Sequence, residues 1–260
     1  MAYEKFAMVY DRLMNDMPYV RWVEFAAECF RRCGNPVTVA ELGCGTGSVA
    51  IPLSQKGYTV YGIDLSEDML SVAQSKSRQL AGHVSRGEGT EPVWVQQDMT
   101  EWELGLQVDA VISFCDCLNY VTDPAGVSAV FQRTYAGLKP GGLFVFDVHT
   151  LRTLEEYAAN QPFVYNEEDL SYIWECELEE ETCTIYHDLT FFSREPGGEK
   201  YTRFDETHAQ RAYPLHELKG MLAEAGFSGI RILGDFTWEQ ADEQTERAFF
   251  VAVKPQEDGA

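Results

Sequence analysis

Three glycines at alternate positions mark the part of the chain whose residue types best suit ligand binding. Gly43, Gly45 and Gly47 lie in the segment VAELGCGTG, between an apolar strand pattern and a helical stretch. Glycine allows positive φ angles and a close approach of the backbone to a ligand, and the start of the following helix presents unpaired amide groups. A dinucleotide fingerprint would need glycine at position 48, where Ser48 stands. The spacing therefore predicts a ligand-binding turn and disfavours an NAD-dependent oxidoreductase.

Acidic residues follow the next two strand patterns. Asp64 ends the pattern VYGID, 21 residues after Gly43, where a carboxylate can accept hydrogen bonds from both hydroxyls of a ribose. Asp98 and Met99 close a third strand pattern, where a carboxylate and a soft apolar side chain could flank an adenine. Each acid alone is more simply a turn residue. Their order along the chain favours a shared nucleoside site.

A fourth strand pattern ends in the segment 114–120, where Phe114, Asp116 and Asn119 could reach the same crevice. In open α/β sheets, ligands bind outside the carboxyl ends of the strands, and all four segments lie at such ends. The sequence therefore predicts that the glycine turn, Asp64, Asp98 and Asp116 meet at one edge of a sheet.

The elements that must position these residues alternate between strand and helix. Apolar strand patterns occupy 37–42, 59–63, 93–97, 110–114 and 143–148, and helical patterns occupy 18–32, 48–56 and 126–138. A helix that ends at Gly226 follows later. We expect 229–234 and 248–253 to form a last, antiparallel pair, because only 13 residues separate them. Continuous apolar strands that alternate with helices predict an α/β fold, with a mostly parallel sheet covered on both faces.

The pattern changes between residues 149 and 212. Three stretches there alternate apolar and polar residues with a period of two, which predicts an inserted antiparallel β meander. Residues 155–181 carry ten acids and no Lys or Arg, as expected of a solvated face. We therefore divide the chain into a core of residues 1–148 and 213–260, with an N-terminal helical cap, and an inserted cover of residues 149–212.

These motifs resemble those of class I S-adenosylmethionine-dependent methyltransferases, and in particular the small bacterial methyltransferases of the YqeM-like type. The resemblance covers residues 37–148 and 214–254 and is based on ELGCGTG at 41–47, Asp64, the pair Asp98-Met99, and LKPGG at 138–142. It implies a Rossmann-like sheet of seven strands in the order 3-2-1-4-5-7-6, with the seventh strand antiparallel. It also implies that the insertion covers the substrate.

The resemblance assigns roles to individual positions. S-adenosylmethionine is the implied cofactor, with its ribose held by Asp64 and its adenine between Asp98 and Met99. The full set of cofactor-binding residues that we expect is Glu41, Gly43, Cys44, Gly45, Gly47, Asp64, Leu65, Met69, Asp98, Met99, Phe114 and Asp116.

Catalytic residues are harder to assign, because the cofactor already carries an activated methyl group. The protein has to align donor and acceptor and to exclude water, and it needs a base only where the acceptor must lose a proton. Tyr10 resembles an N-terminal tyrosine that closes over the cofactor in related enzymes. His149 directly follows the fifth strand and is the candidate base, the alternative being a loop histidine without chemistry.

The insertion holds further polar candidates. His187 shares an apolar face and is more simply a buried, hydrogen-bonded histidine. His208 and Arg211 fall on opposite faces of a regular strand, so a single pocket would not use both without a bulge. Asp116, Asp147 and His149 could surround an oxygen-rich metal site, but their spacing matches no known ligand pattern, and we expect no metal.

Composition limits the partners. The chain has 42 acidic and 20 basic residues and a net charge of −22, which disfavours binding to nucleic acid. The sequence shows no apolar run near about 18 residues and no signal-like N-terminus, so we expect no membrane segment. Seven cysteines without a CxxC pair are typical of free thiols in a reducing compartment and predict a cytoplasmic protein.

The resulting expectation is an enzyme that methylates a nitrogen or oxygen atom of a small molecule. Two alternatives stay open at this point. The acceptor could be an RNA or a protein side chain, or the chain could bind S-adenosylmethionine without catalysis. The shape and charge of the cavity beside the methyl group distinguish them.

Overall fold

A seven-stranded sheet, sheet A, forms the body of the protein. The computed structural model describes residues 9–81, 90–195, 197–242 and 244–256. The strand order is β10-β11-β5-β4-β1-β2-β3, and β11 runs antiparallel to both of its neighbours. The strands are β1 (Thr38–Leu42), β2 (Thr59–Asp64), β3 (Val93–Gln96), β4 (Val108–Ser113), β5 (Leu138–His149), β10 (Ser228–Gly234) and β11 (Arg247–Val253). This confirms the predicted mostly parallel sheet and its order.

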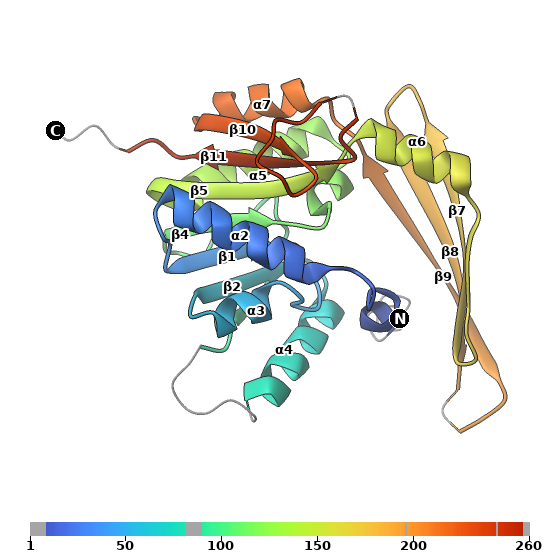
Figure 1. Ribbon diagram of the computed structural model, residues 1–260. Helices are drawn as coiled ribbons and strands as arrows, with labels where there is room; N and C mark the ends of the chain where they lie inside the picture. Colours follow the sequence, from blue (N-terminus) through green and yellow to red (C-terminus); the bar gives the residue numbers. More distant parts are fainter. Residues whose placement is uncertain (1–8, 82–89, 196, 243, 257–260) are drawn as a thin grey trace.

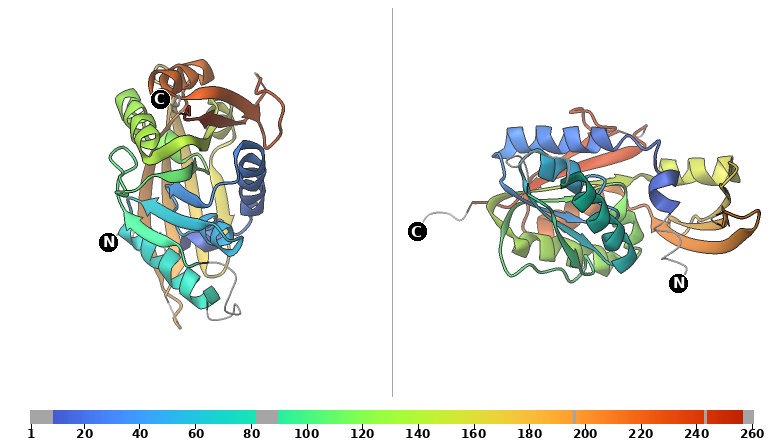
Figure 2. Two further views of the ribbon diagram at one scale, coloured as in Figure 1. Left: turned by 90° about the vertical axis from the view of Figure 1, so that its left-hand side faces the viewer. Right: turned by 90° about the horizontal axis from the view of Figure 1, so that it is seen from below.

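Helices cover both faces of sheet A (Figures 1 and 2). They are α2 (Tyr19–Cys33), α3 (Ala50–Gln55), α4 (Glu67–Ala81), α5 (Pro124–Gly137) and α7 (Leu215–Glu224). Two further helices lie elsewhere: the short 3-10 helix η1 (Cys117–Tyr120) follows β4, and α6 (Leu151–Asn160) packs against the inserted strands described below. The start of α5 is fixed locally, because Asp123 accepts a hydrogen bond from the amide of Ala125 and Pro124 occupies the first turn. In the part of the chain that the structure describes, no helix combines the length and apolar character needed to cross a membrane.

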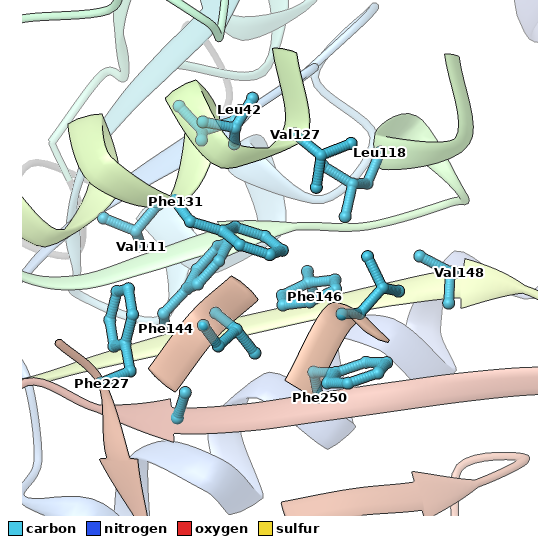
Figure 3. Close-up of a cluster of buried hydrophobic side chains, with 14 of the residues drawn as sticks. Leu42, Val111, Leu118, Val127, Phe131, Phe144, Phe146, Val148, Phe227 and Phe250 are labelled. Carbon is cyan, nitrogen blue, oxygen red and sulfur yellow. The ribbon is translucent and has the colours of Figure 1, made fainter. Parts of the chain in front are cut away.

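Alternation along the central strands builds two separate cores. Phe144 and Phe146 of β5 face α5 and α7, whereas Val145 between them faces α2 and α3. The ring of Phe146 stacks on Phe250 of β11, with ring centroids 4.7 Å apart. Figure 3 shows how this aromatic layer fills the space between the strands and α5. Burial on both faces explains why these strands are continuous apolar runs.

A second sheet, sheet B, lies beyond the edge where the parallel strands of sheet A end; we call this the C-terminal edge. It is antiparallel throughout, in the order β6-β7-β8-β9, and contains β6 (Phe163–Asn166), β7 (Leu170–Glu179), β8 (Thr184–Arg194) and β9 (Tyr201–Arg211). Figure 1 and the right view of Figure 2 show it facing the C-terminal edge, with the helical turn at residues 9–13 between it and the body.

The inserted segment differs from its prediction in one respect. Its three alternating stretches are β7, β8 and β9, and the acidic side chains of β7 are exposed, as expected. However, the insertion begins with α6, and a fourth short strand, β6, precedes the meander. The many acidic residues obscured a helical signal in the sequence, the spacing of Arg152 and Glu156 by one helical turn. In the structure these two residues form an ion pair, and Leu154 between them is buried.

Candidate functional site

The glycine turn between β1 and α3 lies at the C-terminal edge. Gly43, Gly45 and Gly47 have φ angles of 70°, 51° and 79°, all in the left-handed region. A β-carbon on Gly43 would lie 2.6 Å from Sγ of Cys117, so the turn and the segment after β4 are in close contact. A β-carbon on Gly45 would meet no atom within 4 Å. Gly45 therefore borders open space that a ligand can approach.

Asp64 at the end of β2 is bound to this turn. Its Oδ2 accepts a hydrogen bond from the amide of Gly45 at 2.7 Å, and its Oδ1 accepts one from the amide of Ser66 at 2.9 Å. Burial raises the pKa of the Asp64 carboxyl. Of its two neighbours in the predicted set, Leu65 is exposed, whereas Met69 is buried and packs against side chains of sheet B.

Glu41 lies in β1, immediately before the turn. Its side chain is 4% exposed, and its Oε2 has no hydrogen-bond partner among the described residues. Burial raises its pKa, and the nearby charge of Asp64 adds to this effect. A buried carboxyl oxygen without a partner is costly. It is suited to accept a hydrogen bond from a ligand or from water.

The ends of β3 and β4 meet the same turn. Oδ1 of Asp98 accepts hydrogen bonds from the amide and the hydroxyl of Thr100, both at 2.8 Å, so Asp98 shapes the turn after β3. The methyl carbon of Met99 lies 3.4 Å from the position of a β-carbon on Gly43. By contrast, the side chain of Phe114 is 2% exposed and packs in the core beside Phe249. Any contact of Phe114 with a ligand would involve its backbone.

Arg247, at the start of β11, is surrounded by two acids. Its Nη2 donates to Oδ1 of Asp116 at 3.0 Å, and its Nη1 donates to Oδ2 of Asp147. Oδ1 of Asp147 accepts further hydrogen bonds from the indole of Trp22 (3.1 Å) and the amide of Cys115 (2.9 Å). The guanidinium thus occupies the position between the carboxylates. Among the described residues, no group of three or more His, Cys, Asp and Glu side chains could hold a metal ion.

His149 ends β5 and contacts this charge cluster. Asn119 fixes its backbone, since the amide oxygen of Asn119 accepts from the backbone N–H of His149 (3.0 Å) and Nδ2 of Asn119 donates to its carbonyl (3.1 Å). Nη2 of Arg247 donates to Nε2 of the imidazole, because an arginine has no acceptor. Burial lowers the pKa of His149 to about 4.

This geometry corrects the expected role of His149. The residue lies at the C-terminal edge, where the sequence placed it. However, it is 6% exposed and the lone pair of Nε2 is used by Arg247. The proton of the neutral ring is then on Nδ1, an atom without a hydrogen-bond partner in the described ranges. This side chain therefore does not present a free general base.

The N-terminal turn at residues 9–13 is fixed to the glycine turn. Asp11 accepts a hydrogen bond from the hydroxyl of Thr46 (2.5 Å) and pairs with Nζ of Lys76 in α4 (2.8 Å). Tyr10 packs in the cluster that joins Met69 to sheet B. Burial raises its pKa well above the ordinary value, so its phenol stays protonated. The structure thus brings Tyr10 to the region between the two sheets.

A chain of hydrogen bonds joins sheet B to the charge cluster. The indole N–H of Trp174 donates to Nδ1 of His187 (3.1 Å), so Nε2 of His187 carries the proton and donates to Oε1 of Gln210 (3.3 Å). Nε2 of Gln210 in turn donates to Oδ2 of Asp116 at 2.7 Å. His187 is therefore the buried, hydrogen-bonded histidine that the sequence favoured.

The register of β8 and β9 is regular, which places His208 and Arg211 on opposite faces, as predicted. His208 lies on the same face as Gln210, and its ring meets Tyr120 of η1 edge-on, with centroids 6.1 Å apart. Nη1 of Arg211 donates to the carbonyl of Thr122. The sequence analysis missed Gln210 and Arg247. The available signal for Arg247 was a charged residue directly before a long apolar run.

Comparisons with known proteins agree with this geometry. A family model described as a methyltransferase domain matches residues 39–142. The chain is 39% identical over 256 residues to YqeM of Bacillus subtilis (strain 168), which is named as a methyltransferase, and the match covers 98% of each protein. It superimposes with a TM-score of 0.83 and 29% identity on an S-adenosylmethionine-dependent methyltransferase from Clostridium acetobutylicum ATCC 824, covering 99% of this chain and 100% of that one.

A more distant structure has the same fold. The sugar N-methyltransferase KedS8 from Streptoalloteichus sp ATCC 53650 matches with a TM-score of 0.74 at 18% identity, over 95% of this chain and 93% of its own. At this identity the likeness concerns the fold alone.

Proposed function

The chain belongs to the class I S-adenosylmethionine-dependent methyltransferases of the YqeM type, and we propose that it transfers the methyl group of this cofactor to a nitrogen or oxygen atom of a small molecule. The position of sheet B supports this proposal most directly. On one side of the site, Gln210 of sheet B donates a hydrogen bond to Asp116. On the other side, Phe191 and Phe204 of sheet B pack with Met69. An acceptor has to fit between these contacts, which favours a small molecule over a polymer.

The residues at the C-terminal edge fit the cofactor. Oε2 of Glu41 is buried without a partner in the described chain and can accept from the ammonium group of the methionine part or from a bridging water. Gly45 leaves room for the ligand, and Gly43 and Cys44 lie in the same turn. We assign Gly47 a structural role, because a β-carbon there would lie 2.7 Å from the indole of Trp94.

We assign the rest of the cofactor to the ends of β2 and β3. Oδ2 of Asp64 accepts from the amide of Gly45 and Oδ1 from that of Ser66, and the carboxylate has further lone pairs that can receive the ribose hydroxyls. Leu65 and Met69 flank this position, and Asp98 and Met99 would border the adenine. Phe114 contributes its backbone, and the side chain of Asp116 acts on Arg247 and Gln210 and so positions the site.

When bound, the cofactor supplies a methyl group on a positively charged sulfur, so the methyl is already activated. The chain has to bring the acceptor into line and to exclude water. Tyr10 closes the site from the N-terminal side and, as a protonated phenol, donates a hydrogen bond rather than removing a proton. His149 is neutral and its Nε2 is occupied, so it orients Arg247 instead of acting as a base.

The proposal is tested by following the methyl group. Calorimetric titration with S-adenosylmethionine, with NAD as the control, first establishes cofactor binding. The protein is then incubated with tritiated S-adenosylmethionine and a cell extract divided by ultrafiltration into small molecules and macromolecules. We expect label in the small-molecule fraction with the wild type and much less with Asp64→Ala at a low concentration of the cofactor. Label in RNA or protein would support the first alternative acceptor class. Binding without transfer to either fraction would support a non-catalytic binding protein.

A further inference from the structure

Glu206 of β9 is a carboxylate that the assignments above do not use. Among the acidic side chains on the described strands of sheet B, it is the one that is buried, with 6% of its surface exposed. The strand alternation places it on the same face as Phe204, His208 and Gln210. Within the described residues, its Oε1 accepts no hydrogen bond and it forms no ion pair. Its neighbours along the strand, Asp205 and Thr207, are exposed on the outer face.

The residues before and after Glu206 show where this face points. On one side, Phe204 stacks on Phe191 with centroids 4.9 Å apart, and both belong to the cluster that contains Met69 of α4 and Tyr10. Met69 follows Asp64 by five residues at the start of α4, beside the proposed ribose position.

On the other side, His208 meets Tyr120 of η1, and Gln210 binds Asp116 directly after β4. Both contacts lie at the C-terminal edge. Phe204, His208 and Gln210 lie on the same face of β9 as Glu206, and all three contact the body of the protein. Because the side chains on one face of a strand point in the same direction, Glu206 also faces the region between sheet B and the C-terminal edge. This is where the acceptor has to bind if the cofactor occupies the glycine turn.

No positive charge in the described part of the site offsets this carboxylate. Burial lowers the pKa values of His187 and His208, so both rings are neutral near pH 7. The guanidinium of Arg247 is already bound between Asp116 and Asp147. Arg211 lies on the opposite face of β9. Among the described residues, the inner face of sheet B thus carries aromatic and neutral polar side chains with a single buried negative charge.

We propose that Glu206 binds the methyl acceptor and that the acceptor is a small amine; this rests on the proposed small-molecule methyl transfer. The amine reacts in its neutral form. Its nitrogen lone pair forms the new N–C bond while the C–S bond breaks, and the electron pair of that bond stays on sulfur as a neutral thioether. The nitrogen becomes a methylated ammonium, whose charge and N–H the Glu206 carboxylate stabilises. The ammonium then loses one proton to water.

The charge of Glu206 distinguishes between acceptor classes. It attracts an amine in its protonated form, which releases a proton to water before it reacts, and it stabilises the ammonium that develops during transfer. It repels a carboxylate or phosphate acceptor. A hydroxyl acceptor would gain a hydrogen bond but no charge attraction. A carboxylate among aromatic side chains is therefore selective for an amine.

The test uses three variants of the full-length protein. Glu206→Gln keeps the shape of the side chain and removes its charge, and Glu206→Asp keeps the charge and withdraws it by one methylene. Asp205→Asn is the matched control, since it makes the same acid-to-amide change on the outer face of the same strand. Calorimetric titration should give the same dissociation constant for S-adenosylmethionine in all three variants as in the wild type, which shows that each is folded.

The acceptor probe is a small-molecule extract separated by ion exchange into cationic, neutral and anionic pools. Each pool is incubated with tritiated S-adenosylmethionine and one form of the protein. We expect label in the cationic pool alone. In Glu206→Gln, the KM for the active fraction of this pool should rise about ten- to a hundredfold, the loss expected for one hydrogen bond to a charged group, with a smaller change in kcat. Glu206→Asp should be intermediate, and Asp205→Asn should match the wild type.

Two results would overturn the proposal while leaving small-molecule methylation intact. One is label in the neutral or anionic pool, and the other is a wild-type KM in Glu206→Gln. Label that reaches RNA or protein but none of the pools would overturn the proposed function itself, and with it this inference.

Discussion

Replacing Arg247 by methionine tests whether the charge cluster holds the C-terminal edge together. The substitution keeps much of the apolar stem and removes the guanidinium that lies between Asp116 and Asp147. The side chain of Asp147 is fully buried, and those of Asp116 and Arg247 are 14% and 13% exposed. Two carboxylates would then lie together in a site with little water. We expect the free energy of unfolding to fall by about 4 kcal/mol.

The magnitude follows from the geometry. At 3.0 Å, the attraction between Arg247 and Asp116 amounts to about 5 kcal/mol at an effective dielectric constant near 20, and the cost of desolvating the charges offsets part of it. Loss of one partner from a buried ion pair typically costs about 3–5 kcal/mol, because the remaining charge stays buried. This is a large part of the roughly 5–15 kcal/mol that stabilises a typical protein.

The loss should also depend on pH. Without the cation, the two carboxylates repel each other and one of them has a raised pKa in the folded state. The folded protein then binds a proton more tightly than the unfolded chain, so stability present in acid is lost as the pH rises. For a shift of about one unit above an unfolded-state value near about 3.9, the deficit of Arg247→Met should be about 1.3 kcal/mol larger near pH 6 than near pH 3.

Urea unfolding followed by circular dichroism measures the free energy of unfolding and its change with pH. The comparison holds if the slope of this free energy against urea concentration is the same in the variant and the wild type. Arg231→Met is the matched control, because Arg231 is exposed and stacks on Trp238 at 5.0 Å. It should cost about 1 kcal/mol or less. If Arg247→Met lost no more than this control, or if its deficit were the same at both pH values, the cluster would not be the stabilising element that we describe.

Four other substitutions test the site and the core. Asp64→Ala should weaken S-adenosylmethionine binding about ten- to a hundredfold in calorimetry, through loss of hydrogen bonds to a charged group, and unchanged affinity would contradict the ribose assignment. Gly45→Val should abolish binding, whereas Gly105→Val, which has a similarly positive φ and free space around it, carries the same backbone strain and should bind normally. His149→Gln should remove an acid-induced loss of stability. Burial lowers the pKa of His149 in the folded state to about 4, whereas a histidine in the unfolded chain has a pKa of about 6.5. Urea titrations of the wild type should therefore show a loss of up to about 3 kcal/mol as the pH falls between these values. Phe146→Ala should cost about 3–5 kcal/mol in the same assay by leaving a cavity beside Phe250, and a loss below 1 kcal/mol would show that the aromatic layer collapses to fill it.

The fold of the body was predictable because its central strands, β1, β4 and β5, are buried on both faces. Such strands are continuous apolar runs, and Gly34, Gly57 and Gly226 mark the ends of the helices between them. The insertion was less predictable. In strands β7 to β9, apolar and polar residues alternate regularly. Helix α6 buries only a narrow stripe, and its acidic residues are equally typical of a solvated loop, so its helical period was not recognised.

The placement of the proposed cofactor residues along one edge of sheet A was predictable for a different reason. Its residues follow the strands that carry the motif, so the order along the sequence is also the order along the edge. The state of each side chain was not predictable. His149 lies where expected, yet burial lowers its pKa and its Nε2 lone pair is occupied by Arg247, which is 98 residues away. The acceptor side depends on Glu206 and Gln210, whose direction follows from the register of sheet B.

The position of Arg247 suggests a more general way to find such residues. The rule that ligands bind at the carboxyl ends of strands directs attention to residues after each parallel strand. An antiparallel strand in the same sheet has its amino end at that edge, and here Arg247 pairs in register with His149, the last residue of β5. Once the sequence predicts that the final strand is antiparallel, its first residues should therefore be counted with the site. In this chain, that rule would have added the cation that neutralises Asp116 and Asp147 and would have indicated that His149 is not a free base.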